Sequence, residues 1–170
     1  MKVSVTGADV VTALRLPLAA LFPFVHQPMW ELAIVGVAAA TDFADGRLAR
    51  RFGSSRIGAV LDPIADKAFM AAAFLTLASR GVLVWYELVG VLLRDILAVL
   101  GFAATWLLRT PVALPARAGG KAVTVAQLVT LVALIAESPV GPPLAWATAA
   151  IAVYATWDYG RAAARTTAQD

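Results

Sequence analysis

Six long apolar segments make up most of this chain of 170 residues, and short stretches of polar or turn-forming residues separate them. A helix that crosses the hydrocarbon core of a bilayer needs about 20 residues, within a range of about 17–25. Most of the segments reach or approach that length. They run near residues 9–25, 29–51, 58–78, 83–108, 121–136 and 144–164. The pattern predicts an all-α, polytopic membrane protein with six transmembrane helices.

The composition supports this prediction and excludes several kinds of site. Hydrophobic residues make up 61% of the chain and charged residues 15%, whereas a soluble domain carries about 25% charged residues. The chain has no cysteine, which excludes a disulfide framework, a thiolate metal site and a cysteine nucleophile. The single histidine, His26, argues against a histidine-rich metal site or a Ser-His-Asp triad. We expect one membrane domain over residues 1–170.

Positively charged residues are distributed unevenly between the two sides of the predicted bundle. With the N-terminus inside, ten of them fall at inner ends and loops, and only Arg80 is basic among the outer loops. The ten are Lys2, Arg47, Arg50, Arg51, Arg56, Arg109, Arg117, Lys121, Arg161 and Arg165. Because cytoplasmic loops carry the excess of lysine and arginine, we expect both termini in the cytoplasm. The net charge of +3 is therefore a topology signal in the cell membrane and does not indicate nucleic-acid binding.

Four aspartates lie in the second and third segments, although a mid-membrane carboxylate costs roughly 2.5–3.5 kcal/mol. The pattern is Asp42-x-x-Asp45-Gly46-x-x-Ala49-Arg50, then seven residues, then Gly58-x-x-x-Asp62-x-x-x-Asp66. Spacings of three and four residues place each pair of aspartates on one face of a helix. The short loop makes the two helices antiparallel neighbours. We therefore expect the two pairs to face each other at equal depth, open to the cytosol.

Four carboxylates at one depth would repel each other unless cations lie among them. Oxygen ligands without histidine or cysteine suit hard cations, so we expect Mg²⁺ or Mn²⁺. Two such ions would clamp a phosphoryl group from both sides. Gly46 and Gly58 let a ligand approach the backbone, and Arg50 can bind phosphate oxygens with two nitrogens. The alternative, a set of helix-end charges paired with arginines, leaves the glycine spacing unexplained.

The pattern resembles the signature of the CDP-alcohol phosphotransferases, and each fixed position is filled. The gap between Arg50 and Gly58 is one residue shorter than is usual in that family, which joins an alcohol to a CDP-activated group and releases CMP. The metal ligands implied by the resemblance are Asp42, Asp45, Asp62 and Asp66, and the implied CDP-binding residues are Gly46, Ala49, Arg50, Gly58, Asp9 and Thr12. Asp66 is also implied as the base that takes the proton from the acceptor hydroxyl, and the family suggests a homodimer.

Shorter matches favour the phosphatidylglycerophosphate synthase branch of this family. They are Asp62-Pro63-Ile64-Ala65-Asp66-Lys67, Thr12-x-x-Arg15, Arg94-Asp95 and Gly120-Lys121-x-x-Thr124-x-x-Gln127. This branch implies CDP-diacylglycerol as the donor and sn-glycerol 3-phosphate as the acceptor, whose phosphate we expect near Lys121, Arg117 and Arg161. The core motif also fits relatives with another acceptor, namely phosphatidylglycerol, as in cardiolipin synthase, or inositol phosphate.

Two interpretations of other classes compete with a transferase. A divalent-cation transporter also places carboxylates within the membrane, but its polar groups should continue toward the outer face, and few do. A catalytically inactive relative is disfavoured by the complete motif. Among the remaining charges, we expect Arg94 in a buried ion pair or helix contact, leave Arg15 open, and assign Glu31, near an outer helix end, no function.

Overall fold

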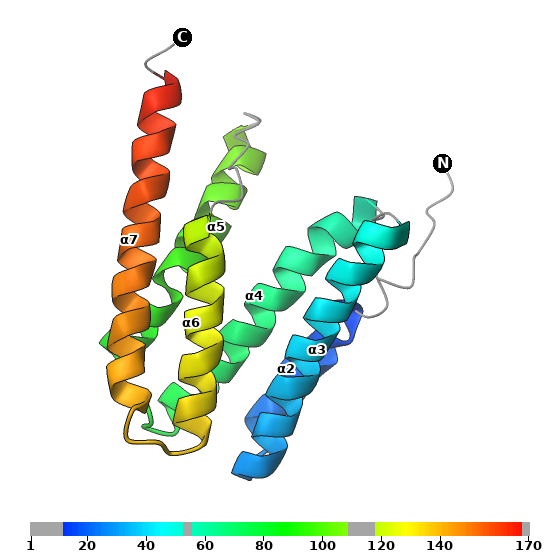
Figure 1. Cartoon of the computed structure of the whole chain (residues 1–170), viewed down its shortest axis with the longest axis vertical. Coiled ribbons are helices and arrows are strands. Elements are labelled where there is room, and N and C mark those ends of the chain that lie inside the picture. The colour runs from blue at the N-terminus through cyan, green and yellow to red at the C-terminus, as the bar shows by residue number, and fades with distance from the viewer. Residues whose placement is uncertain (1–11, 53–55, 109–117, 168–170) are drawn as a thin grey trace. The chain divides into compact units, whose positions relative to one another are not determined.

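The computed structural model describes the backbone of residues 12–52, 56–108 and 118–167, and the side chains of residues 12–44, 64–101, 120–158 and 161. These residues form helices and no strand, as predicted. The elements are α2 (Arg15–Leu21), the short 3₁₀ helix η1 (Phe22–Phe24), α3 (Pro28–Phe52), α4 (Arg56–Ser79), α5 (Trp85–Leu108), α6 (Ala118–Ile135) and α7 (Gly141–Thr167), as Figure 1 shows.

The helix bounds lie close to the predicted segments. The first segment corresponds to α2 and η1 together, and each of the other five corresponds to one long helix. Pro28 opens α3, where its fixed φ suits the first helical position, and Gly81, with φ of +78°, follows α4 in the left-handed conformation common after helices. Within the described stretches, none of these helices combines the length and the apolar character needed to cross a bilayer.

The chain divides into two compact units, Met1–Arg80 and Gly81–Asp170. The first contains α2, η1, α3 and α4, and the second contains α5, α6 and α7 (Figure 1). The prediction of a single domain over residues 1–170 stays a prediction.

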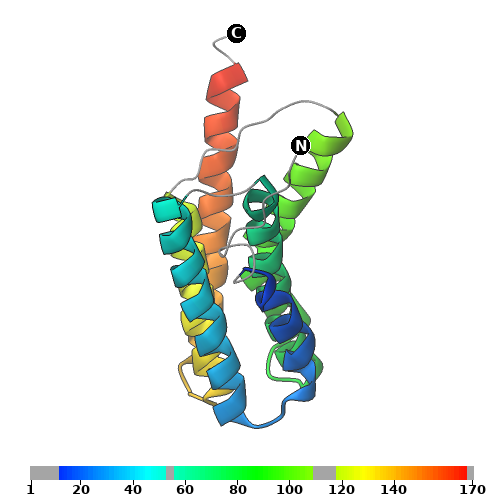
Figure 2. The same ribbon diagram turned by 90° about the vertical axis from the view of Figure 1, so that its right-hand side faces the viewer.

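In the first unit, α2 packs along α4 and also contacts α3; Figure 2 shows α2 beside α4. Phe22 of η1 is fully buried and meets Phe69 of α4 edge to face, with ring centroids 6.1 Å apart. Small buried residues, Ala65 and Ala73 on α4 among them, let the helices approach closely. The short α2 is therefore held in place by the apolar face of α4.

Arg80 ties the beginning of α3 to the end of α4. Its guanidinium donates hydrogen bonds to the carboxylate of Glu31, in the first turn of α3, and to the backbone carbonyls of Val25 and Pro23. The side chain of Glu31 is only 5% exposed, against 25% for Arg80. Because the contact joins opposite ends of the two helices, α3 and α4 run antiparallel, as expected. Glu31, expected to need no role, is a buried structural ion-pair partner.

In the second unit, α7 packs against both α5 and α6. The approach of α5 to α7 is close at Gly90, where an added Cβ would lie 2.8 Å from the Cβ of Ala149. Ala145, Ala152 and Ala155 of α7 are also buried. Small residues at such contacts allow helix backbones to come together, which explains why α7 can serve as the shared neighbour of the other two helices.

Polar side chains inside the second unit pair with each other. Nε2 of Gln127, on α6, donates to Oδ2 of Asp95 at 2.7 Å and to the carbonyl oxygen of Val91 at 2.9 Å, both on α5. The hydroxyls of Thr130 and Thr148 lie 2.8 Å apart between α6 and α7. These contacts give partners to the amide nitrogen of Gln127 and to both threonine hydroxyls, and they link all three helices of this unit.

Arg94 lies beside this polar contact, with its Nη1 3.4 Å from Oδ1 of Asp95. The side chains of Arg94 and Asp95 are 20% and 7% exposed. The expected ion pair of Arg94 is therefore present in the structure, and the arginine itself is only partly buried.

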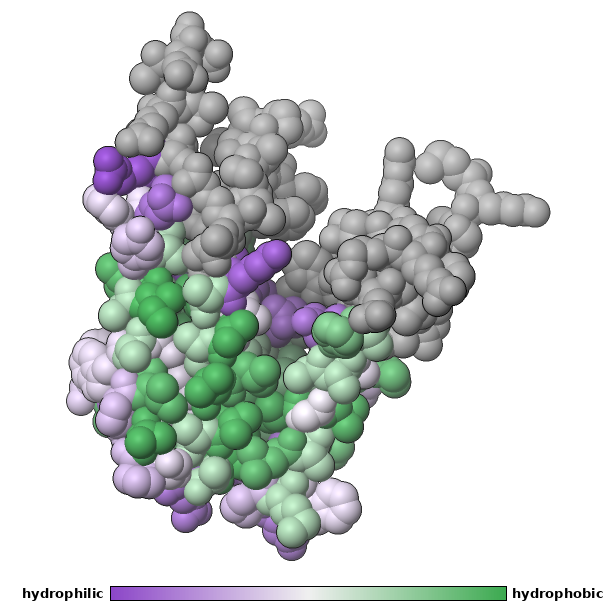
Figure 3. Space-filling model, viewed as in Figure 1, coloured by the Kyte–Doolittle hydropathy of each residue, from purple (hydrophilic) through white to green (hydrophobic). Residues whose placement is uncertain are grey.

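Much of the surface of the second unit is apolar. On the face shown in Figure 3, hydrophobic side chains cover the middle of this unit, and hydrophilic side chains lie toward its two ends. Its exposed large hydrophobic residues include Val125, Val129 and Val132 of α6 and Trp146, Val153, Tyr154 and Trp157 of α7.

Candidate metal and nucleotide site

The aspartate motif is divided between two antiparallel helices of the first unit. Its first half, residues 42–50, lies on α3, and its second half, residues 58–66, lies on α4. The structure describes the side chains of Asp42 and Asp66. The structure describes only the backbone at the motif positions Asp45, Gly46, Ala49, Arg50, Gly58 and Asp62, and Asp9 and Arg117 lie outside the described residues. The predicted facing of the two aspartate pairs at equal depth stays a prediction.

Asp42 is held by an arginine from the neighbouring helix. Its Oδ1 lies 3.1 Å from Nη1 of Arg15, on α2. The exposures of the two partners differ greatly, since the side chain of Arg15 is 1% exposed and that of Asp42 is 56% exposed. Thr12, three residues before Arg15, is also buried. The ion pair therefore joins an accessible carboxylate to a cation buried inside the unit.

Asp66 lies next to a second cation. Its Oδ2 is 3.5 Å from Nζ of Lys67, the following residue on α4, and the side chains of Asp66 and Lys67 are 28% and 18% exposed. The preceding residue, Ala65, is fully buried in the contact with the rest of the unit. Asp66 therefore lies at the border between the core and the surface, where a carboxylate can still meet an incoming group.

The donor chemistry of the motif fits a hard divalent cation. The two motif aspartates with described side chains, Asp42 and Asp66, offer carboxylate oxygens, which Mg²⁺ and Mn²⁺ prefer. In the part of the chain whose side chains are described, no group of three or more His, Cys, Asp or Glu residues is placed to hold a metal. The four-aspartate site predicted from the sequence therefore stays a prediction.

The candidates for binding the acceptor phosphate belong to the second unit. Lys121 is exposed in the first turn of α6, at the edge of a mostly apolar groove of about 470 Å³ between α6 and α7. Arg161, on α7, lies over the ring of Trp157 with 4.6 Å between its Cζ and the ring centroid. Both cations are accessible on the surface of their own unit.

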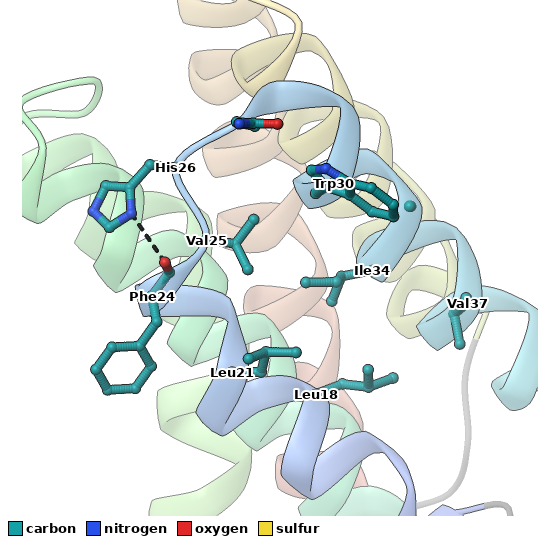
Figure 4. Close-up of a pocket in the computed structure, with 10 residues that line it drawn as sticks. Leu18, Leu21, Phe24, Val25, His26, Trp30, Ile34 and Val37 are labelled. Carbon is teal, nitrogen blue, oxygen red and sulfur yellow. Dashed lines mark hydrogen bonds between the residues drawn. The ribbon is translucent and has the colours of Figure 1, made fainter.

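An open apolar groove of about 610 Å³ separates α2 from α3 at the end of the first unit that is farther from Asp42 along α3. Figure 4 shows Leu18 and Leu21 of α2 and Ile34 and Val37 of α3 lining it. At its rim, Nδ1 of His26 lies 3.0 Å from the carbonyl oxygen of Phe24. The groove adds to the apolar surface that this unit presents to its surroundings.

The sequence alone did not assign a role to Arg15. The spacing Thr12-x-x-Arg15 marked Arg15 as a residue of interest, but no local pattern in the chain could name its partner. One partner is Asp42, which lies 27 positions later in the sequence.

Comparison with known proteins defines the class to which the chain belongs. Residues 5–157 match the CDP-alcohol phosphatidyltransferase family, and the matched region includes the whole aspartate motif. The chain therefore belongs to this family, as its motif indicated. The family uses CDP-alcohol donors and alcohol acceptors, and it generally depends on divalent metal ions.

Individual relatives carry two different names. The chain is 33% identical over 124 residues to a putative cardiolipin synthase of Mycobacterium tuberculosis, an alignment that covers 70% of this chain and 59% of the relative. It is 37% identical over 133 residues to a CDP-diacylglycerol–glycerol-3-phosphate 3-phosphatidyltransferase of Yersinia enterocolitica, covering 69% of this chain and 66% of the relative. The chain thus spans about three-fifths to two-thirds of the length of these relatives.

Proposed function

We propose that this protein transfers a phosphatidyl group from CDP-diacylglycerol to the hydroxyl of sn-glycerol 3-phosphate and releases CMP. The observation that carries this proposal is the complete aspartate motif on two antiparallel helices, in a chain that belongs to the CDP-alcohol phosphatidyltransferase family. The shorter sequence matches and the name of the Yersinia relative favour glycerol 3-phosphate. The name of the mycobacterial relatives keeps phosphatidylglycerol as the second acceptor to test.

The proposed reaction needs a base and a site for negative charge. The acceptor oxygen forms a bond to the phosphorus that carries the diacylglycerol, and the bond from this phosphorus to the CMP oxygen breaks with its electron pair leaving on CMP. Asp66 takes the hydroxyl proton, which requires only that its carboxylate reach the attacking oxygen. Its partial exposure leaves that approach open.

The remaining motif residues have binding roles in this proposal. Asp42, Asp45, Asp62 and Asp66 would hold Mg²⁺ or Mn²⁺, which neutralises the diphosphate of the donor when bound. The CDP portion would be bound by Gly46, Ala49, Arg50, Gly58, Asp9 and Thr12. Lys121, Arg117 and Arg161 are proposed for the acceptor phosphate, because each is a cation near a predicted cytoplasmic helix end.

We also propose that the protein lies in the cell membrane with this site facing the cytosol, and that it forms a homodimer. Two observations support the membrane location. Basic residues gather at one side of the predicted bundle, and both units present large apolar side chains on their surfaces. A substrate with two acyl chains also requires an enzyme that works at a lipid surface.

An acceptor panel tests the proposed function. Purified protein in mixed micelles of CDP-diacylglycerol would be supplied with Mg²⁺ or Mn²⁺ and one acceptor at a time, and CMP release would be measured. The panel is glycerol 3-phosphate, phosphatidylglycerol, inositol phosphate, inositol and serine. We expect the fastest release with glycerol 3-phosphate and none after chelation of the metal. Faster release with phosphatidylglycerol would show that this lipid is the acceptor, as in the cardiolipin synthase reaction, and would contradict glycerol 3-phosphate as the acceptor.

A further inference from the structure

Arg15 combines almost complete burial with a contact to an accessible carboxylate. Its side chain is 1% exposed, and Arg15 is among the largest fully buried side chains of the described residues. A buried guanidinium is unfavourable unless it is paired. It forms an ion pair with Asp42, whose own side chain is 56% exposed. The first unit therefore contains a buried positive charge on α2 that is paired with an aspartate on α3. Solvent and ligands can reach this aspartate.

We propose that Arg15 is a positioning residue that orients Asp42 as a metal ligand, an inference that rests on the proposed metal site. A carboxylate has two oxygens and several lone-pair directions. The ion pair of 3.1 Å draws Oδ1 of Asp42 toward Nη1 of the buried Arg15, which restricts the orientation of the carboxylate, and a cation would be ligated by Oδ2. Partners that orient a metal ligand in this way typically contribute about 10–100-fold to metal affinity.

The burial of Arg15 argues against a direct role in binding the donor phosphates. A phosphate-binding arginine must present its planar fork to the ligand. The helix that carries Arg15 packs along α4, and the side chains of Thr12, Arg15 and Ala19 at successive turns of this segment are all buried. We therefore assign Arg15 an effect through Asp42, with which it forms an ion pair.

A cation beside a metal ligand has two opposing effects on metal binding. Its charge repels the metal ion, whereas its contact orients the ligand. Asp42 is mostly exposed, so solvent screens the repulsion, while the orientation does not depend on screening. The orienting effect should therefore win, and loss of Arg15 should weaken metal binding. If Arg15 only supplied positive charge in place of the metal ion, its loss would instead strengthen metal binding.

Mn²⁺ binding to the purified full chain, measured by electron paramagnetic resonance without any nucleotide, shows whether loss of Arg15 weakens or strengthens metal binding. We expect Arg15→Met to weaken Mn²⁺ binding about 10–100-fold, and Arg15→Lys, which keeps the charge and loses the fork, to give a smaller loss. Arg80→Met is the matched control, since it breaks an arginine–carboxylate ion pair of the same unit that contains no motif residue and should leave Mn²⁺ affinity unchanged. Unchanged or tighter Mn²⁺ binding by Arg15→Met would overturn the proposal.

A double-mutant cycle tests whether Arg15 acts through Asp42. We expect the pair Arg15→Met and Asp42→Asn to bind Mn²⁺ no more weakly than Asp42→Asn alone, whereas additive losses would show an independent role. Should Arg15→Met fail to fold, a loss of affinity in Arg15→Lys supports the proposal and its absence overturns it. If Asp42→Asn binds Mn²⁺ as the unaltered protein does, the metal site itself is wrong. If only Asp42→Asn loses affinity, the role of Arg15 alone is wrong.

Discussion

Among the side chains that the structure describes, the first unit contains two arginine–carboxylate pairs with opposite patterns of exposure. In the Arg15–Asp42 pair the arginine is buried and the carboxylate is 56% exposed. In the Arg80–Glu31 pair the carboxylate is 5% exposed and the arginine is 25% exposed. An accessible carboxylate can bind a ligand, whereas a buried one is fully used in holding helices together. The comparison separates a carboxylate suited to chemistry from one suited to structure, although both lie on α3.

The largest expected effect is on the rate of CMP release, after a change in the aspartate motif. Asp66→Asn removes the proposed base while keeping the size of the side chain, so we expect CMP release to fall by about 10²–10⁴-fold. Binding of CDP-diacylglycerol, measured by protection against thermal unfolding, should be largely kept. The matched change at the other end, Glu31→Gln, should leave the rate per folded molecule near that of the unaltered protein. Equal losses of rate in both variants would contradict the distinction between a motif carboxylate used in the reaction and the structural carboxylate of Glu31.

The second effect is on stability at the opposite end. Arg80→Met leaves Glu31 buried without its partner, which typically costs about 3–5 kcal/mol. We expect a markedly lower midpoint of thermal unfolding in detergent, with Mn²⁺ affinity unchanged in the fraction that remains folded. An unfolding midpoint equal to that of the unaltered protein would mean that the Arg80–Glu31 pair does not hold α3 to α4.

A smaller effect is expected in the second unit, where no motif residue lies. Gly90→Ala places a methyl group 2.8 Å from the Cβ of Ala149, and overpacking of this kind costs about 1–3 kcal/mol. Gly36→Ala is the control in the first unit, because an added Cβ there meets nothing within 4 Å. Thermal unfolding should show a loss for the first change and no loss, or a slight gain from helix propensity, for the second. Similar midpoints for both variants would contradict the close contact of α5 with α7.

The smallest expected effect concerns the hydroxyl pair between α6 and α7. Thr148→Val removes a contact of 2.8 Å to the buried Thr130, and hydrogen bonds between helices in membrane proteins average about 0.6 kcal/mol. We expect a slight drop in the unfolding midpoint and unchanged CMP release. A drop as large as that of Arg80→Met would show that the polar interior of the second unit matters as much as the ion pair of the first.

Local features of the chain predicted most of the fold. Helix bounds depend on apolar runs and on nearby turn residues such as Pro28 and Gly81, so the predicted segments and the observed helices agree closely. The antiparallel arrangement of α3 and α4 also followed from a short loop. The aspartate motif and the family were readable for the same reason, because the signature lies within 25 consecutive positions of the chain.

The partners of charged residues could not be predicted in the same way. Glu31 was expected near an outer helix end without a function and Arg80 in an outer loop, and their pairing was not predicted because 49 positions separate them and nothing local links them. Arg15 and Asp42 are likewise joined only once α2 lies against its neighbours. Which carboxylate becomes buried is decided by packing, and neither residue type nor spacing along the chain contains that information.

The most direct test compares the two carboxylates of α3 in one assay. CMP release from CDP-diacylglycerol, with glycerol 3-phosphate and Mg²⁺ present, would be measured for the unaltered protein, Asp42→Asn and Glu31→Gln at equal amounts of folded protein. The account predicts release by the unaltered protein and by Glu31→Gln, and almost none by Asp42→Asn. Release by Asp42→Asn at the unaltered rate, or no release by the unaltered protein, would contradict it.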